Sequence, residues 1–165
     1  MMSILYRNLV LILILVGVTS CGYTLRGNLA LNESIEEISV YSSRYSELTN
    51  SINILLTNNN IRTSGQKNPS NYRIQIFSES FNRRQLSVNL SGRVNEYEVI
   101  YSVEFNISPP SEIGKAENIT LYRDYSFDEN QVMGNTNRED SIKKEMISTA
   151  ATLIINKLIA QTNSM

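Results

Sequence analysis

The residue with the most distinctive chemistry in this sequence is Cys21, because it is the only cysteine and it follows an apolar N-terminal segment. The sequence Val18-Thr19-Ser20-Cys21 resembles a bacterial lipobox, in which an aliphatic residue and two small residues precede a cysteine. At such a site a diacylglyceryl group is attached to the cysteine sulfur, the chain is cut before the cysteine, and the new amino group is acylated. Two or more acyl chains anchor a protein stably, since each buried CH₂ contributes roughly 0.8 kcal/mol. We therefore predict that Cys21 is lipidated.

The residues before Cys21 have the three parts of a secretory signal peptide. Positions 1–8 carry one basic side chain, Arg7, positions 9–16 are entirely apolar, and positions 17–20 are small or β-branched. The apolar run is too short for a stable membrane-spanning helix. We expect residues 1–20 to be a lipoprotein signal peptide and residues 21–165 to be a single α/β domain with a lipidated N-terminus. The alternative is an ordinary cleaved signal followed by a stray buried cysteine.

Enzymatic chemistry has few candidate residues in this chain. There is no histidine, and the single cysteine is expected to be acylated, so Ser-His and Cys-His nucleophile systems are excluded. Glu96, Glu98 and Glu104 lie along one face of a predicted strand, whereas the paired carboxylates of glycosidases face each other across a cleft. No clustered spacing of acidic residues predicts a metal site. We expect no enzymatic activity, no metal and no cofactor.

Arginines are the remaining candidates for a binding site. Arg83, Arg84 and Arg93 flank the predicted tip of a hairpin between residues 81 and 94, and a basic hairpin end suits contact with phosphate groups. The alternative is a solvated loop that keeps the strands soluble. The formal net charge of −1 lacks the basic excess of a nucleic-acid-binding protein, so we expect no nucleic-acid partner.

The elements that must position these residues can be predicted from hydrophobic periodicity. A short strand over residues 35–41 precedes an amphipathic helix over residues 44–57, and the three asparagines 58–60 end that helix. Residues 64–71 form a polar loop. The apolar residues that recur at helical spacing are Tyr45, Leu48, Ile52, Leu55 and Leu56.

Strand signals dominate the middle of the chain. One strand begins at Tyr72 and continues to Phe81, and a third lies over residues 119–127. Between them, aromatic and aliphatic residues alternate with polar ones from position 97 to 107, which is typical of a half-buried antiparallel strand. The prolines at 109 and 110 end this strand. At this spacing the tyrosines 97, 101 and 125 are expected to pack against neighbouring strands.

The last predicted helix starts at a capping box, Thr136-x-x-Glu139, and runs to about Ala160. The predicted order is therefore β-α-β-β-β-α. The simplest packing is an α+β two-layer sandwich, with both helices on one face of a four-stranded, mostly antiparallel sheet. The apolar stripe of this helix comprises Ile142, Met146, Ala150 and Leu153, widened by Ile147, Ala151, Ile154 and Leu158.

Several segments resemble one protein family. The expected mature start, Cys21-Gly22-Tyr23-Thr24-Leu25-Arg26-Gly27, resembles the Cys-Gly-aromatic-x-Leu-Arg opening of the LPS-assembly lipoprotein family LptE. Other segments resemble the family in the same order, and together they span nearly all of residues 21–162. They are residues 51–63, Glu96-Tyr97, Tyr122-Arg123-Asp124-Tyr125, Asp140-x-Ile142-x-Lys144-Glu145-Met146 and Lys157-Leu158.

The resemblance implies a fold of two helices on a four-stranded sheet, and it implies a function. Members of this family sit in the lumen of the outer-membrane β-barrel LptD, plug it, assist its assembly, bind lipopolysaccharide and assist its delivery to the outer leaflet. Gly22 stands where an Asp would resemble an inner-membrane retention signal, so the anchor is expected in the inner leaflet of the outer membrane. The second hypothesis is an accessory or pilot lipoprotein of another envelope transport complex, which would share the lipobox but not the internal motifs.

The resemblance also suggests contact residues. Arg26 lies in the family opening and would orient the domain against the membrane or barrel. The alternative is that Arg26 is a solvated arginine beside the lipid anchor. Basic residues implicated in lipopolysaccharide contact elsewhere in the family fall on Leu90 and Asn135, which are uncharged here. Nearby Arg93 and Arg138 are the candidate replacements, and with Arg26, Arg83 and Arg84 they form the set of possible lipopolysaccharide or partner contacts. Arg123 and Lys144 match family positions, and structural roles are expected for both.

Overall fold

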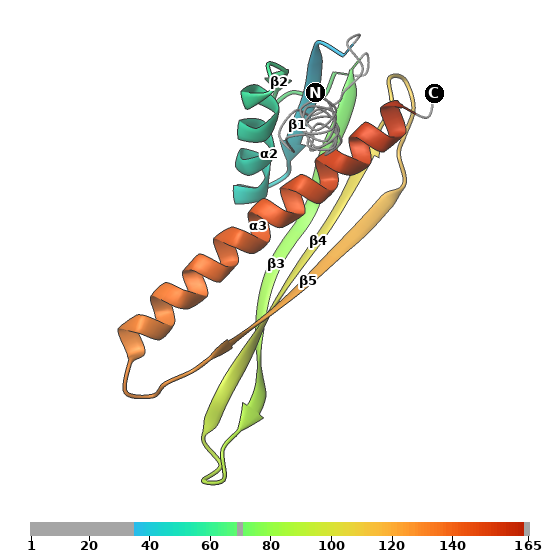
Figure 1. Cartoon of the computed structure of the whole chain (residues 1–165). Helices are drawn as coiled ribbons and strands as arrows, with labels where there is room; N and C mark the ends of the chain where they lie inside the picture. The colour runs from blue at the N-terminus through green and yellow to red at the C-terminus, as the bar shows by residue number, and fades with distance from the viewer. Residues whose placement is uncertain (1–34, 69–70, 164–165) are drawn as a thin grey trace, which may run out of the picture.

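A five-stranded sheet covered on one face by two helices forms the described part of the computed structural model, residues 35–68 and 71–163 (Figure 1). In the sheet the strand order is β2-β1-β3-β4-β5. The α+β class and the placement of both helices on one face are confirmed. In chain order the elements are β1 (Glu37–Ser42), α2 (Glu47–Asn58), β2 (Arg62–Ser64), β3 (Tyr72–Val88), β4 (Val94–Ser108), β5 (Ala116–Ser126) and α3 (Val132–Thr162).

The prediction of four strands is wrong by one, because β2 was not recognised. This strand has only three residues, too few for a hydrophobic period, and it ends where a polar loop was predicted. It pairs in parallel with β1, from Glu37↔Arg62 to Ser39↔Ser64. The longer pairs β3–β4 and β4–β5 are antiparallel, as predicted, while β1 is parallel to β3 as well.

Helix α2 starts three residues later than predicted. Ser46 is its N-cap, and the Ser46 Oγ accepts a hydrogen bond from the Thr49 backbone N–H at 3.0 Å. Tyr45 therefore precedes the helix and is 84% exposed, so its assignment to the apolar stripe is wrong. The predicted end is confirmed: Asn59 is the C-cap and Asn60 adopts a left-handed conformation with φ of 62°.

Strands β3 and β4 form a long hairpin that projects past the other strands (Figure 1). The hairpin tip predicted between residues 81 and 94 is present but shorter than that range, since β3 pairs with β4 as far as Val88↔Val94 and only residues 89–93 form the turn. The register shifts between Ile76 and Ser78. Because of this bulge, even-numbered β3 residues face the helices before Phe77 and odd-numbered residues, including Arg83, face them afterwards.

Helix α3 begins at Val132, with Gln131 as N-cap, and so Thr136 lies inside the helix. The predicted capping box at Thr136 is wrong. The segment before it is held by other bonds, in which the Asn135 side chain accepts from the Asp128 N–H at 3.2 Å and donates to the Asp128 C=O at 2.6 Å. Leu153 is 43% exposed and does not belong to the buried stripe.

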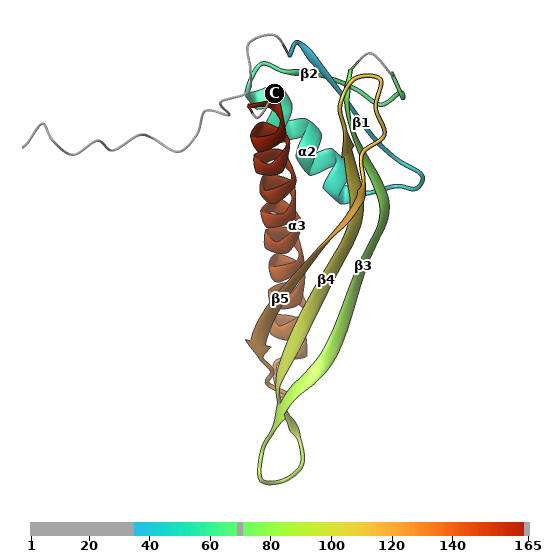
Figure 2. The same ribbon diagram turned by 90° about the vertical axis from the view of Figure 1, so that its right-hand side faces the viewer.

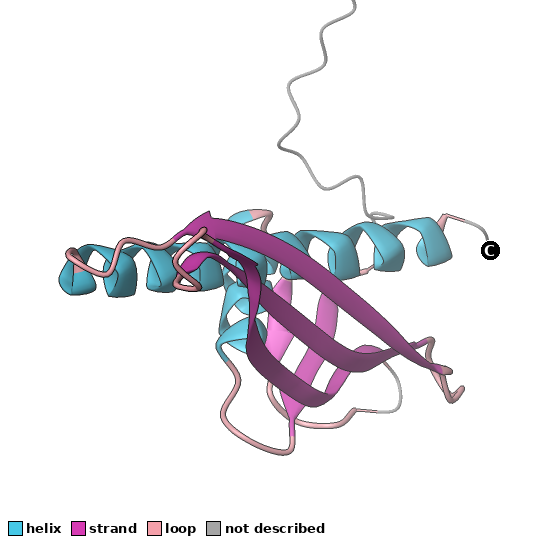
Figure 3. Cartoon of the chain, turned by 90° about the horizontal axis from the view of Figure 1, so that it is seen from below, coloured by secondary structure: helices cyan, strands magenta, loops and turns pink. Residues whose placement is uncertain are grey.

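The hydrophobic core lies between the helices and the sheet. Helices α2 and α3 contact each other on the same side of the sheet (Figure 2), and α3 continues past α2 along the projecting hairpin. Figure 3 shows from below how α3 runs along one side of the twisted strands. The largest fully buried side chains include Tyr101, Phe105, Leu48, Ile52, Met146, Ile154 and Leu158.

Candidate functional site

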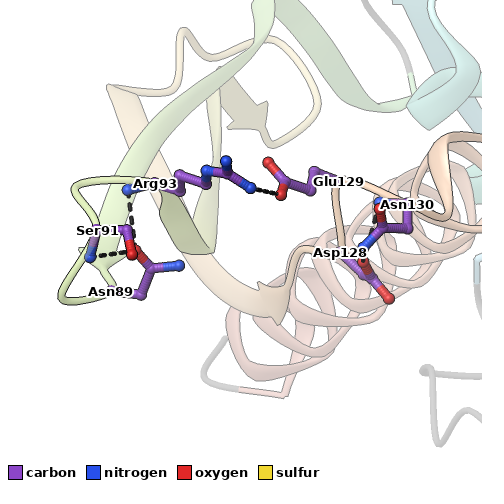
Figure 4. A network of polar contacts seen from close by, with 6 residues as sticks. All are labelled: Asn89, Ser91, Arg93, Asp128, Glu129 and Asn130. Carbon is purple, nitrogen blue, oxygen red and sulfur yellow. Dashed lines mark hydrogen bonds and ion pairs between the residues drawn. The ribbon is translucent and has the colours of Figure 1, made fainter.

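The projecting end of the molecule gathers most of the predicted contact residues. We call this region the hairpin end; it comprises the turn 89–93 with the adjoining strand ends, the segment 127–131, and the first turns of α3 up to Lys143 (Figure 1). The turn is narrow and strongly bonded. The Asn89 Oδ1 accepts from the N–H groups of Ser91 at 2.9 Å and Arg93 at 3.0 Å (Figure 4). Gly92 has a φ of 76°. Glycine adopts this positive φ without strain, which suits Gly92 to its place in the turn.

An ion pair ties the turn to the segment that leads into α3. Arg93 Nη1 contacts Glu129 Oε1 across 36 residues of sequence (Figure 4). On the same segment the Asp128 Oδ1 accepts from the Asn130 N–H at 2.9 Å. This ion pair therefore holds the turn 89–93 against the segment 127–131. The side chains of Arg93 and Glu129 are both about half exposed.

The most connected charged group at the hairpin end is Glu139 on α3. Its carboxylate accepts from Arg83 at 2.9 Å, from the Tyr125 hydroxyl at 2.8 Å and from Lys143 at 2.7 Å. Partial burial alone would raise the pKa of Glu139, but the hydrogen bonds from Lys143, Tyr125 and Arg83 outweigh burial and lower this pKa from 4.5 to about 2. Glu139 is thus ionised at neutral pH and joins α3 to β3 and β5.

Aromatic rings pack against this charged network. The Arg83 guanidinium lies 4.4 Å from the centroid of the Tyr97 ring, and Tyr97 also meets Phe127 edge-on at 5.1 Å. Phe81 stacks on Tyr101 at 4.2 Å. The expectation that tyrosines 97, 101 and 125 pack against neighbouring strands is confirmed. Arg83, Tyr125, Phe127 and Asn135 line a concave space of about 350 Å³ beside Glu139.

Apolar side chains are exposed around the turn. Leu86 is 45% exposed, Val88 is 57% exposed, and Leu90 is fully exposed at the tip. Met133, on the first turn of α3, is 79% exposed. The hairpin end thus combines three paired arginines, Arg83, Arg84 and Arg93, with four apolar side chains that remain exposed in the described chain.

The predicted contact residues at the hairpin end do not share one surface. Arg83 and Arg84 lie within β3 rather than in a loop, and they point to opposite faces of the sheet: Arg83 reaches Glu139 on the helix side, whereas Arg84 pairs with Glu98 at 2.6 Å on the other side. Arg93 follows the turn, and Arg138 is exposed on α3. Arg26, Cys21 and the lipobox residues Val18, Thr19 and Ser20 lie outside the described residues.

Sequence reasoning missed the role of Glu139, which was assigned to a helix cap. The available signal was the spacing Glu139–Lys143, since an acid four residues before a base predicts an ion pair on a helix face. Among residues 35–68 and 71–163, no group of three or more Cys, Asp or Glu side chains could hold a metal ion. In the same ranges, no helix is both long enough and apolar enough to cross a bilayer.

Comparison with known proteins places this fold among lipoproteins. A family model described as "LptE: Lipopolysaccharide-assembly" matches residues 35–158. The chain is 23% identical over 162 residues to the LPS-assembly lipoprotein LptE of Pectobacterium atrosepticum, covering 95% of this chain and 86% of that protein.

Solved structures of lipoproteins have the same fold. The crystal structure of the rare lipoprotein B from Shewanella oneidensis is 30% identical with a TM-score of 0.68, and the match covers 78% of this chain and 96% of that chain. The solution structure of lipoprotein B from Nitrosomonas europaea has a TM-score of 0.71 at 23% identity, covering 86% of this chain and 93% of that chain. The family model spans β1 to most of α3 and therefore includes the whole hairpin end.

Proposed function

This chain belongs to the LptE lipopolysaccharide-assembly family, and we propose that it acts as the partner of an LptD-type β-barrel in the outer membrane. A role in lipopolysaccharide transport and assembly follows from the family and from the related LPS-assembly lipoprotein. The complex with the barrel is the proposal. The family match over residues 35–158 carries it, because that range includes α2, most of α3 and all five strands.

We propose that the protein is a lipoprotein of a Gram-negative envelope, anchored through acylated Cys21 in the inner leaflet of the outer membrane. The lipobox Val18-Thr19-Ser20 and the absence of Asp at position 22 support this placement. The similar lipoproteins support the anchor itself. Residues 1–20 would then be removed, and residues 21–165 would form the mature domain.

The uncovered face of the sheet supports a position in the lumen of the barrel. Its central row runs Ser80↔Ser102↔Thr120 across three strands, with Glu98 and Glu104 on the same face of β4. Small hydroxyl groups and carboxylates suit a hydrated, polar barrel interior better than a hydrocarbon surface. We propose that this domain plugs the lumen and assists barrel assembly by its shape and polarity.

Contact with lipopolysaccharide phosphates would fall to arginines. Arg83, Arg84 and Arg93 are each paired with a carboxylate, so a phosphate would have to share or displace that partner. Arg138 is exposed and takes part in none of the ion pairs found among the described residues. We therefore propose Arg138, on α3, as the first contact at the hairpin end, with Arg93 after the turn as a second contact and Arg26 as a contact near the anchor.

We also propose that the protein catalyses no reaction. The family is one of assembly lipoproteins, and the whole chain has no histidine and one cysteine, which the proposed anchor consumes. Binding and plugging need no covalent step, so shape and charge are sufficient for the proposed role.

The decisive experiment is depletion of the protein in its host, combined with purification of the tagged chain. On depletion we expect loss of surface lipopolysaccharide and misassembly of the barrel. On purification we expect an LptD-type barrel protein bound to the tagged chain. A normal surface together with a different envelope complex bound to the chain would favour a pilot lipoprotein instead. For lipopolysaccharide contact, Arg138→Gln should reduce co-elution of purified lipopolysaccharide, while Arg44→Gln, which changes an exposed arginine before α2, should not.

A further inference from the structure

An exposed tyrosine lies on the face of the sheet opposite the two helices (Figure 2). Tyr122 on β5 is 53% exposed and directly faces Ile100 on β4, which is partly buried. Val99 and Tyr101, the sequence neighbours of Ile100, point into the core. Because side chains alternate between the faces of a strand, Ile100 and its partner Tyr122 point away from the helices.

Polar side chains surround Tyr122 on the same face. Thr120 and Asp124 lie two residues before and after it on β5, and Asn82 on β3 belongs to the cross-strand row Asn82↔Ile100↔Tyr122. All three side chains are exposed, and none of them makes a hydrogen bond or an ion pair to another residue of the described ranges. An amide, a hydroxyl and a carboxylate with unused donors and acceptors therefore flank the ring.

The carboxylate of Asp124 is unfavourably placed within the protein itself. Asp124 directly faces Glu98 on β4, and like charges opposite each other destabilise a sheet. Arg84 on β3 pairs with Glu98 at 2.6 Å, whereas Asp124 belongs to no ion pair between described residues. A ligand that donates hydrogen bonds to Asp124 would offset this repulsion.

A sugar chain has the groups that this surface lacks. The C–H groups on one face of a sugar ring stack on an aromatic ring, and the hydroxyl groups at its rim donate to carboxylates and amide oxygens. Neighbouring strands lie about 4.8 Å apart, and same-face residues of one strand lie about 7 Å apart. A sugar stacked on Tyr122 would therefore reach Thr120 and Asp124 with its rim. Asn82, two strands away, would meet the next sugar of the chain.

The charge of this face favours sugars over phosphate groups. The cross-strand rows centred on Ser102 and Ile100 carry no charge. In the next row, the pair with Glu98 neutralises Arg84. Asp124 would repel a phosphate, but it is a strong acceptor for a sugar hydroxyl. This face therefore matches an uncharged saccharide.

We propose that the face centred on Tyr122 binds the uncharged sugars of the lipopolysaccharide saccharide chain. Tyr122 stacks on one sugar ring, Asp124 and Thr120 bind its hydroxyl groups, and Asn82 contacts the next ring. The proposal rests on the proposed function, because lipopolysaccharide assembly brings this saccharide to the protein. The site differs from the arginines proposed for phosphate contact, since it lies on the sheet and has no free cation of its own.

Titration with an oligosaccharide that lacks lipid A tests the site directly. The probe is the core oligosaccharide released from lipopolysaccharide, added to the isotope-labelled full-length chain in detergent micelles and followed by nuclear magnetic resonance. We expect shifts in the amide signals around Tyr122. Tyr122→Ala should weaken binding by about 5-fold or more, because stacking is lost. Asp124→Asn should also weaken it without destabilising the fold, since the substitution removes the repulsion by Glu98.

Tyr45→Ala is the matched control, because Tyr45 is an exposed tyrosine in the segment before α2. This variant should bind the oligosaccharide like the wild type. Enzymatic removal of phosphate from the oligosaccharide should leave binding unchanged or strengthen it. Absence of shifts, equal weakening by Tyr45→Ala and Tyr122→Ala, or loss of binding after dephosphorylation would each overturn the proposal. Tighter binding of a cell-wall glycan fragment would overturn lipopolysaccharide as the source of the sugar.

Purification of the tagged Tyr122→Ala chain separates this proposal from the proposed function. The variant should still bring down the barrel protein, because the site is assigned to the sugar and not to the barrel wall. Loss of the barrel from Tyr122→Ala, with sugar binding unchanged, would show that this face contacts the barrel instead. The titration contains no barrel, so a failure to bind sugar would leave the proposed complex unaffected.

Discussion

Replacing Glu139 by glutamine should destabilise the protein mainly above pH 4.5. This change keeps the shape of the side chain but removes the charge that accepts from Arg83, Tyr125 and Lys143. The folded-state pKa of Glu139 lies near 2, below its ordinary value of 4.5. A carboxylate with a lowered pKa stabilises the fold above its unfolded pKa, and that contribution is lost as the pH falls through the folded pKa.

The magnitude follows from the size of the pKa shift. A lowering from 4.5 to about 2 corresponds to roughly 3 kcal/mol at 1.36 kcal/mol per pKa unit. Two of the three partners are partly in water, since the side chain of Arg83 is 48% exposed and that of Lys143 is 33% exposed. Solvent screening reduces such pairs, so we expect Glu139→Gln to lower the free energy of unfolding by about 1–2 kcal/mol at pH 7.

Urea unfolding followed by far-ultraviolet circular dichroism at pH 7 and pH 2.5 measures this effect. Glu145→Gln is the matched control, because Glu145 is exposed on the same helix and belongs to none of the ion pairs of the described chain. The control should change stability by less than about 0.5 kcal/mol. Equal stability of the two variants at pH 7, or a Glu139→Gln variant that is as destabilised at pH 2.5 as at pH 7, would refute a stabilising role for the Glu139 charge.

Three further substitutions test the packing by the same unfolding measurement. Tyr101→Phe should leave stability unchanged or raise it by up to about 1 kcal/mol, because the buried Tyr101 hydroxyl makes no hydrogen bond of acceptable geometry to a described residue. Gly114→Ala should cost more than about 2 kcal/mol, since a Cβ there would lie 1.9 Å from the Ile107 carbonyl oxygen. Ile154→Ala should cost about 2–5 kcal/mol, because the side chain of Ile154, a residue of α3, is fully buried. The matched control for Tyr101→Phe is Tyr125→Phe, which should lower the free energy of unfolding by about 1 kcal/mol because it removes the hydrogen bond to Glu139. The controls for the other two substitutions are Gly65→Ala and Ile54→Ala, which should both be nearly neutral. A destabilised Tyr101→Phe variant, or a tolerated Gly114→Ala variant, would contradict the packing described above.

The elements with strong periodicity were predictable, and those without it were not. Alternation from position 97 to 107 located β4, and the prolines that follow marked its end at Ser108. Strand β2 was missed because three residues carry no period. The start of α3 was misplaced because Thr136 and Glu139 match a cap pattern, while the bonds between Asp128 and Asn135 extend the helix four residues earlier.

For the arginines of the hairpin end, too, only part of the arrangement could be predicted from the sequence. Their number was visible in the sequence, but their partners were not, because Glu139 lies 56 residues from Arg83 and Glu129 lies 36 residues from Arg93. The bulge after Ile76 decides which side of the sheet each side chain faces. Without that shift, Arg83 would point away from α3 and its network could not form.

By itself the sequence determined the lipobox pattern at Cys21, the absence of histidine chemistry and the α+β class, because each depends on residue types or on local periods. Only the tertiary structure decided that three arginines are already paired, that the turn 89–93 exposes Leu90, and that β5 ends the sheet with an open edge. These features depend on contacts between segments far apart in the chain, and hydrophobic periodicity carries no information about which segments meet.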